Sequence, residues 1–351
     1  MILKENTLTL SIQPYKMLTF EIFPFNSRDG FSCNLWRLKS SNAITKEPVL
    51  LIHGAGVRSN VFNPPNQKNL LHILAEEGYD VWLENWRGSI DCEINEWDLD
   101  IVAKNDHPAA VEEVCRITNV SSIKAIIHCQ GSTSFIISAI LGLLPQVSMI
   151  ISNAVSLHPI VPSFSKIKIN YLLPVVKPLT NFLNPHWGDF PPDLKAKILR
   201  TFVNLTHWEN DTNVGKFVSF TYGSGFPALW ELNNLTEETK EWIRGEFGNV
   251  PISFFDHIKK CINANQLVSN NNNVHYASIK PKTDTRIAFF AGKLNKCFKS
   301  ESQEKSWQYF NSIKSSYHSL HLIEEYSHLD IFFGKNALND VFPLMIKELN
   351  Q

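Results

Sequence analysis

The chain has 351 residues, of which 44% are hydrophobic, and it carries a formal net charge of −1. This length predicts one large domain with an insertion, or two domains, with enough apolar residues for a sizeable core. The near-neutral charge, without any block of like charge, excludes nucleic acid as a partner.

Cysteine usage and hydropathy suggest where the protein works. The six cysteines are scattered and form no CxxC pair, so the sequence predicts neither a zinc site nor a disulfide framework. The opening residues lack the long apolar core of a signal peptide, and the longest apolar stretch, 135–144, is too short to span a bilayer. We therefore expect a cytoplasmic protein without a transmembrane segment, whose thiols are reduced.

The first half of the chain alternates short apolar runs with helical ones. Residues 18–38 predict two antiparallel strands joined by a turn at Asp29–Gly30. The elements predicted after them are strand 48–54, helix 67–78, strand 79–86, helix 107–118 with Pro108 in its first turn, strand 123–129 and strand 147–155. Nearly continuous apolar strands between helices indicate a parallel sheet that is covered on both faces.

This alternation stops near Leu157 and resumes near Lys280. Between them the chain is rich in Pro, Trp, Phe and Asn, which predicts an inserted, mostly helical lid. The elements predicted after it are strand 285–292, helix 302–313, strand 319–326 and a closing helix 336–349. We therefore predict an α/β protein in three parts: a first core part over 1–156, a lid or cap insertion over 157–280, and a last core part over 281–351.

The stretch SIKAIIHCQGSTSF (122–135) places Cys129 on a tight turn between a predicted strand and a predicted helix. Such a turn lifts a nucleophile clear of the backbone, and the first amides of the helix favour negative charge beside it. Gly131 is small enough to let strand and helix approach. Ile127 stands where the G-x-S-x-G pattern has its first Gly, so this pattern is only half kept.

Other positions complete a catalytic set around Cys129. The backbone N–H groups of Ala55, in HGAG (53–56), and of Gln130 are candidate donors to an oxyanion. His328 follows the last predicted strand, where a general base belongs, and Asn295 lies in a strand-end loop, where the orienting group belongs. A thiolate–imidazolium pair needs little help from a carboxylate, so a neutral amide suffices. Three carboxylates remain alternative orienting groups: Asp330, Glu324 and Glu325.

Several motifs make the chain resemble an α/β-hydrolase of the acid-lipase-like group: VWLENWRGS (81–89), NDHPA (105–109) and HLDIFFGKNA (328–337). A closer similarity is to the hydrolase-like unit that accompanies cholesterol-oxidase-type (GMC) oxidoreductases. It rests on HC-x-GS (128–132), SLHP (156–159) and FTYGSGFPALWELNNLT (220–236). The similarity runs from about residue 18 to the end and includes no flavin-binding segment. It implies the α/β-hydrolase fold, with Cys129 in place of the lipases' Ser.

With Cys129, His328 and Asn295 in these roles, the leading hypothesis is acyl chemistry on an ester or thioester through a covalent acyl-Cys129 intermediate, by hydrolysis or by acyl transfer. The aromatic insertion predicts a bulky apolar acyl group, with His158 and Trp230 lining its pocket and an acyl carrier or CoA as a candidate donor. No cofactor and no metal are expected. His128 is expected to point away from the site, and Cys297 to be a surface or loop thiol.

Two other functions remain open at this point. One is an acyltransferase similar to polyhydroxyalkanoate synthases, which also place Cys in a lipase-like turn. The other is a cyclase, lyase or binding protein on the same fold, which Ile127 and Asn295 favour, because fold alone does not fix function.

Overall fold

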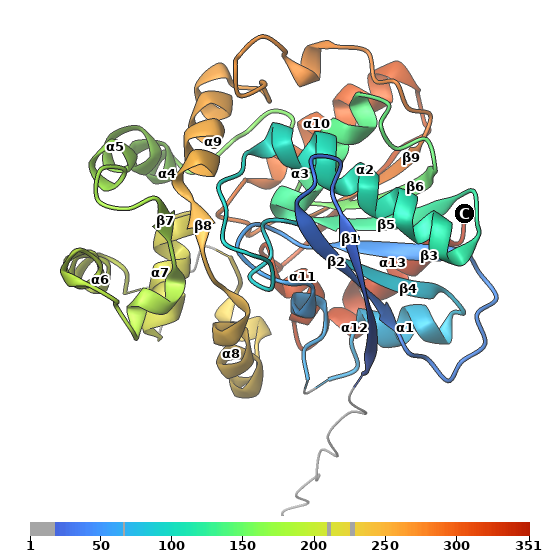
Figure 1. Ribbon diagram of the computed structural model, residues 1–351, viewed down its shortest axis with the longest axis horizontal. Helices are drawn as coiled ribbons and strands as arrows, with labels where there is room; N and C mark the ends of the chain where they lie inside the picture. Colours follow the sequence, from blue (N-terminus) through green and yellow to red (C-terminus); the bar gives the residue numbers. More distant parts are fainter. Residues whose placement is uncertain (1–17, 66, 209–211, 225–228) are drawn as a thin grey trace, which may run out of the picture.

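The computed structural model describes residues 18–65, 67–208, 212–224 and 229–351 (Figure 1). The opening residues, read above for a signal peptide, and part of the 220–236 motif lie outside the described residues. Within the described residues, no helix is both long enough and apolar enough to cross a membrane.

The described residues form an eight-stranded sheet with the order β1-β2-β4-β3-β5-β6-β9-β10. The strands are β1 (Phe20–Asn26), β2 (Ser32–Leu38), β3 (Pro48–Ile52), β4 (Asp80–Asn85), β5 (Ile123–His128), β6 (Val147–Asn153), β9 (Arg286–Gly292) and β10 (Ser319–Ile323). Strand β2 pairs antiparallel with β1 and β4, and every other pair in this sheet is parallel. The predicted α/β class with a mostly parallel sheet is therefore confirmed.

Helices cover both faces of the sheet because its central strands are apolar on both sides. Along β3, Leu50 and Ile52 pack into one buried cluster and Val49 and Leu51 into another, as expected for side chains that alternate across a strand. Outside residues 157–280, the helices of the first cluster are α2 (Leu99–Thr118), α3 (Cys129–Ile140) and α10 (Ser300–Ile313). Those of the second are α1 (Leu70–Glu76), α11 (Asp330–Phe333), α12 (Ala337–Asp340) and α13 (Phe342–Leu349).

Helix α2 begins earlier than the sequence predicted, and Pro108 lies inside it rather than in its first turn. The true start is capped by the Asp98 carboxylate, which accepts the Ile101 N–H at 2.9 Å. Pro108 has no N–H to donate to the carbonyl of Lys104, four residues earlier, so the helical ladder lacks one hydrogen bond there. The predicted closing helix 336–349 is likewise split, into α12 and α13.

The segment 157–280 lies between β6 and β9 in the chain and to one side of the sheet, at the left of Figure 1. Its described residues are mostly helical, with one two-stranded sheet, β7–β8. Its elements are α4 (Ser163–Ile167), η2 (Lys168–Leu172), α5 (Leu173–Val176), β7 (Phe182–Leu183), η3 (Pro185–Gly188), α6 (Leu194–Thr206), α7 (Asn213–Tyr222), η4 (Leu232–Asn234), α8 (Glu237–Ile243), η5 (Arg244–Glu246), β8 (Val250–Pro251), α9 (Ile252–Ala264) and η6 (Tyr276–Ser278). Its role as a lid, and the three-part division at residues 156 and 280, stay predictions.

Candidate active site

Cys129 occupies a strained turn between β5 and α3. Its φ of +58° is a left-handed conformation that residues other than Gly seldom adopt. Two glycines make room for this turn. A Cβ on Gly54 would lie 3.1 Å from the Cys129 Sγ, and a Cβ on Gly131 would lie 2.2 Å from the His53 carbonyl oxygen. Gly131 thus lets α3 pack closely against the end of β3.

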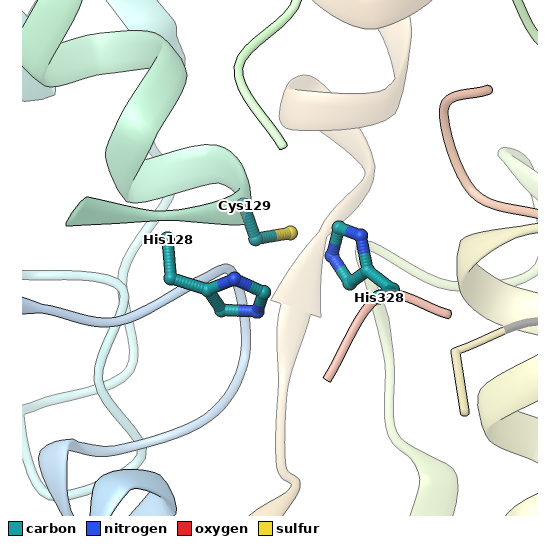
Figure 2. Close-up of side chains that lie close together, drawn as sticks. All are labelled: His128, Cys129 and His328. Atoms are coloured by element: carbon teal, nitrogen blue, oxygen red, sulfur yellow. The ribbon is translucent and has the colours of Figure 1, made fainter. Parts of the chain in front are cut away.

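His328 faces Cys129 across the end of the sheet (Figure 2). The Cys129 sulfur, a ring nitrogen of His328 and a ring nitrogen of His128 all lie within 4.8 Å of one another. The His328 Nε2 has no hydrogen-bond partner among the described residues, whereas its Nδ1 lies 3.0 Å from the side-chain nitrogen of Asn295. The sequence predicted that Cys129, His328 and Asn295 form one site. In the structure these three side chains lie close together.

The side-chain amide of Asn295 has a fixed orientation. Its Oδ1 accepts the backbone N–H of Cys297 at 2.9 Å, so its Nδ2 is the atom that faces His328. Both Asn295 and His328 are buried.

The alternative carboxylates have other environments. Asp330 accepts the N–H of Ser327 at 3.0 Å and the amide of Asn234 at 2.7 Å. Glu324 is exposed and pairs with Lys293, and Glu325 is exposed as well. Asn295 is accordingly the group that contacts the His328 ring.

Burial keeps the thiol and the imidazole neutral. Burial raises the pKa of Cys129 to about 11, although the backbone N–H groups of Gln130 and Ala55 bond to the sulfur and favour the thiolate. Burial also lowers the pKa of His328 to about 3. The two N–H groups expected to hold an oxyanion therefore face the sulfur, and the resting pair is a thiol beside an uncharged imidazole.

An apolar cavity opens beside Cys129. The cavity and its opening to solvent together have a volume of about 960 Å³, and they lie between the sheet and the 157–280 segment. Cys129, Gln130 and Ala55 line it on the core side, and its far wall is mostly aliphatic and aromatic. The aromatic lining residues from α7 and α9 are Phe220, Tyr222, Phe254 and Phe255. This shape and lining suit a large apolar group.

The residues predicted to line the pocket require a correction. Neither His158 nor Trp230 belongs to the described lining of this cavity. His158 turns toward the carbonyl of Asn265, 3.4 Å away, and Trp230 packs against Phe247 at the edge of a separate, smaller cavity. The aromatic wall comes instead from α9, where Phe254, Ile258 and Ile262 recur every four residues along one face.

The sequence also misjudged two neighbours of the site. The His128 ring does not point away, because its centroid lies 4.7 Å from that of His328. Its Nδ1 lies 2.8 Å from the side-chain amide nitrogen of Asn153, at the end of β6. Cys297, predicted to be a surface or loop thiol, does lie in a loop after β9, but it is not at the surface. It is buried and lines the same cavity as Cys129, as a residue two positions from Asn295 would.

Tyr222 was not singled out from the sequence, yet it supports the oxyanion loop. Its hydroxyl donates to the carbonyl oxygen of Ala55 at 3.0 Å, and its side chain lines the cavity. This contact joins the end of α7 to the loop after β3. No local pattern in the sequence signals such a contact, because it depends on how the 157–280 segment folds back.

A buried hydrogen-bond network supports the turn from behind. The Ser134 hydroxyl lies 2.6 Å from Nε2 of His107, whose Nδ1 lies 2.9 Å from the carboxylate of Glu84. Ser134 also donates to the side-chain oxygen of Gln130 at 3.2 Å. All three members have no exposed surface and none lines the cavity, so this Ser–His–Glu arrangement is structural.

His128, Cys129 and His328 also offer three ligand atoms to a metal ion. A histidine that binds a metal usually donates its other ring N–H to a carboxylate or a carbonyl. Here the Nδ1 atoms of His128 and His328 each face an amide nitrogen, of Asn153 and Asn295 respectively. These donors disfavour the tautomers that a metal would need, so the two histidines are poorly set to bind an ion.

No family model matches the chain. Its sequence is 29% identical to sterol esterase 2 of Saccharomyces cerevisiae over 133 residues, covering 33% of this chain and 25% of that protein. It is 31% identical to mouse gastric triacylglycerol lipase over 141 residues, covering 34% and 35% of the two chains. The alignments thus span only about a quarter to a third of these relatives.

Solved structures extend the likeness to the whole fold. The structure described as DcsB in complex with its substrate analogue superposes with a TM-score of 0.60 at 13% identity, covering 95% of this chain and 99% of that one. An esterase from Exiguobacterium antarcticum gives 0.54 at 12% identity, covering 93% and 99%. The chain therefore has the α/β-hydrolase fold. The narrower resemblance to the unit associated with GMC oxidoreductases stays a prediction.

Proposed function

We propose that this protein acts on an ester or thioester of a bulky apolar acyl group through a covalent acyl-Cys129 intermediate. The observation that carries this proposal is the position of the Cys129 sulfur. It sits on a strained turn, receives two backbone N–H groups and lies beside His328 and an apolar cavity. Relatives named sterol esterase and triacylglycerol lipase support an ester of a lipid as substrate.

The reaction would proceed in two halves. In the first, the Cys129 sulfur bonds to the carbonyl carbon while the thiol proton passes to His328, and the N–H groups of Ala55 and Gln130 hold the oxyanion. The proton then moves to the leaving oxygen or sulfur, whose bond to carbon breaks. In the second half, water attacks the thioester and gives a proton to His328. That proton returns to the sulfur as the free acid leaves.

Intact-mass spectrometry tests the intermediate. Incubation with p-nitrophenyl decanoate or decanoyl-CoA should add one decanoyl group to the native protein and release decanoic acid. The Cys129→Ala variant should form no adduct and lose turnover by about 10³-fold or more, because nothing replaces the nucleophile. Cys115→Ala removes a thiol that lies outside the cavity and serves as the matched control. Full turnover of Cys129→Ala would contradict the proposal.

Acyl transfer is the second candidate, and the apolar lining of the cavity favours it. Few polar groups line the cavity, so little water is held near the acyl-Cys129 bond. The same incubation distinguishes the two outcomes when CoA or a simple alcohol is added. With p-nitrophenyl decanoate as donor, transfer would give decanoyl-CoA or a decanoate ester in place of free decanoic acid, whereas hydrolysis would leave the acid as the main product.

A further inference from the structure

We propose that Asn295 is a positioning residue that holds His328 in the Nε2–H tautomer. Cys129 then stays a protonated thiol until the side-chain amide of Asn295 rotates and exchanges the places of its oxygen and nitrogen. This inference rests on the proposed function of Cys129 and adds a control to it. It assigns Asn295 a role opposite to that of an orienting aspartate, which accepts a proton from the ring rather than donating one.

The first step is the direction of the Asn295 amide. Its oxygen accepts the Cys297 N–H at 2.9 Å, and its nitrogen lies 3.0 Å from Nδ1 of His328. If the amide were reversed, its NH₂ group would face the N–H of Cys297, and two donors would meet in a buried site. The observed orientation is therefore the one that satisfies both neighbours, and Asn295 donates to the ring.

The second step concerns the proton on His328. A neutral imidazole carries one N–H, and a nitrogen that accepts a hydrogen bond is the one without it. Nδ1 accepts from Asn295, so the proton of the uncharged ring is on Nε2. Nε2 is also the ring nitrogen without a partner among the described residues. In this tautomer, the nitrogen that a general base needs is already protonated.

Serine proteases give the scale of this effect. Replacing their orienting aspartate by asparagine leaves the geometry intact but lowers kcat by about 10⁴-fold, because the imidazole takes the wrong tautomer.

The third step is that no neighbouring group among the described residues favours the Nδ1–H tautomer, in which Nε2 of His328 could accept the thiol proton. The Nδ1 of His128 faces the amide nitrogen of Asn153 in the same way. Burial raises the pKa values of two further groups at the site, the Cys297 thiol and the Tyr222 phenol, and keeps both uncharged. Lys168 also lines the cavity, but its ammonium group donates to the carbonyls of Ser219 and Phe220 and offers no acceptor to the ring. The carboxylates considered from the sequence lie elsewhere. Among the described residues, Asn295 is thus the group that decides which nitrogen of His328 carries the proton.

Turning the Asn295 amide over would reverse this state. Its oxygen would then accept an Nδ1–H from His328, and Nε2 would be free to take the thiol proton. The turn breaks the bond to the Cys297 N–H, which holds the resting form. An aspartate at position 295 needs no such turn, because its two oxygens accept both the Cys297 N–H and the Nδ1–H. Asn295→Asp should therefore fix the reactive form.

Alkylation of Cys129 by iodoacetamide measures this difference without any substrate. We expect Asn295→Asp to raise the rate constant by about tenfold or more at pH 7, with the pH midpoint of alkylation shifted downward. The same variant combined with Cys129→Ala corrects for the other thiols. Asn295→Ala, which can neither donate nor accept, should not match the gain. An unchanged or lower rate in Asn295→Asp would overturn the inference.

A measurement on the native protein covers the case in which Asn295→Asp does not fold. Long-range ¹H–¹⁵N spectra of ¹⁵N-histidine protein report which ring nitrogen of each histidine carries the proton, and His328→Gln identifies the His328 signal. We expect the Nε2–H tautomer, and an Nδ1–H tautomer would refute the inference. Neither readout depends on acyl transfer, so a missing decanoyl adduct would count against the proposed function alone.

Discussion

At the residue scale, the site combines a thiol with an amide where lipases combine a hydroxyl with a carboxylate. The two differences support each other. A thiol ionises far more readily than a hydroxyl, so under the proposed function we expect Cys129 to react even when its base is available only part of the time. A serine hydroxyl is much harder to ionise than a thiol. It depends on a base that is always ready, and Asn295 does not keep His328 in that state.

Exchanging the nucleophile tests this dependence. We expect Cys129→Ser to lose about 10²–10⁴-fold in kcat/KM toward p-nitrophenyl decanoate, the range that general base catalysis contributes. Adding Asn295→Asp to that variant should recover most of the loss, because a carboxylate supplies the Nδ1–H tautomer that serine requires. The two changes should therefore be strongly non-additive. A single Cys129→Ser variant as active as the native protein would count against this view.

Much of the site could be predicted from the sequence because its residues follow strand ends. Cys129 comes directly after β5, and Asn295 and His328 lie in the loops that follow β9 and β10, so the parallel strands bring all three to one edge of the sheet. The direction of the Asn295 amide could not be predicted. It depends on the N–H of Cys297, and a sequence pattern does not reveal where a backbone N–H points.

At the element scale, the junction between β5 and α3 depends on the absence of a side chain at Gly131. A Cβ there would lie 2.2 Å from the His53 carbonyl oxygen and 2.7 Å from a methyl group of Ile52. Neither neighbour is a flexible side-chain end, since one is backbone and the other belongs to a buried strand. Packing at this junction also sets the position of the Gln130 N–H, so the structure and the proposed chemistry share one constraint.

We expect Gly131→Ala to lower the free energy of unfolding by about 3 kcal/mol, because an extra methyl group is forced into a packed junction. Urea denaturation followed by tryptophan fluorescence measures the change. Gly245→Ala is the matched control, since a Cβ at Gly245 would meet no atom within 4 Å. That variant should stay within about 0.5 kcal/mol of the native protein. Equal effects of the two substitutions would contradict the role assigned to Gly131.

Element types were easier to predict from the sequence than element ends. The central strands were found because their residues are buried on both faces, as along β3. The start of α2 was placed about eight residues too late, because Pro108 was taken as a first-turn residue while the cap at Asp98 was overlooked. The aromatic wall of the cavity was assigned to Trp230 rather than α9, because its composition was read without its helical period.

At the scale of the whole molecule, the site combines residues from the two parts of the chain that flank the 157–280 segment. Cys129 belongs to the first part of the sheet, whereas Asn295 and His328 follow β9 and β10, on the far side of the 157–280 segment in the chain. These last strands are held in turn by the C-terminal helix. Glu348 of α13 lies 2.6 Å from Arg286 of β9 and 2.6 Å from His321 of β10. One carboxylate therefore ties the end of the chain to both strands.

This tie should make stability depend on pH in a particular window. The hydrogen bonds from His321 and Arg286 lower the pKa of Glu348 to about 2, although burial alone would raise it. A carboxylate whose pKa is lower in the folded state stabilises the protein above its unfolded pKa of about 4.3. That contribution is lost progressively as the pH falls from there toward 2.

We expect Glu348→Gln to lower the free energy of unfolding by about 2 kcal/mol at pH 7, because Arg286 and His321 then lose the carboxylate that both contact. The difference from the native protein should shrink between pH 5 and pH 3, as protonation removes the same charge from native Glu348. Urea denaturation at pH 7, 5, 4 and 3 measures it. Glu237→Gln, in an exposed pair with Lys240, should show almost no change at any of these pH values. A loss of stability in Glu348→Gln that stays constant down to pH 3 would mean that the carboxylate's charge does not hold α13 against the last two strands.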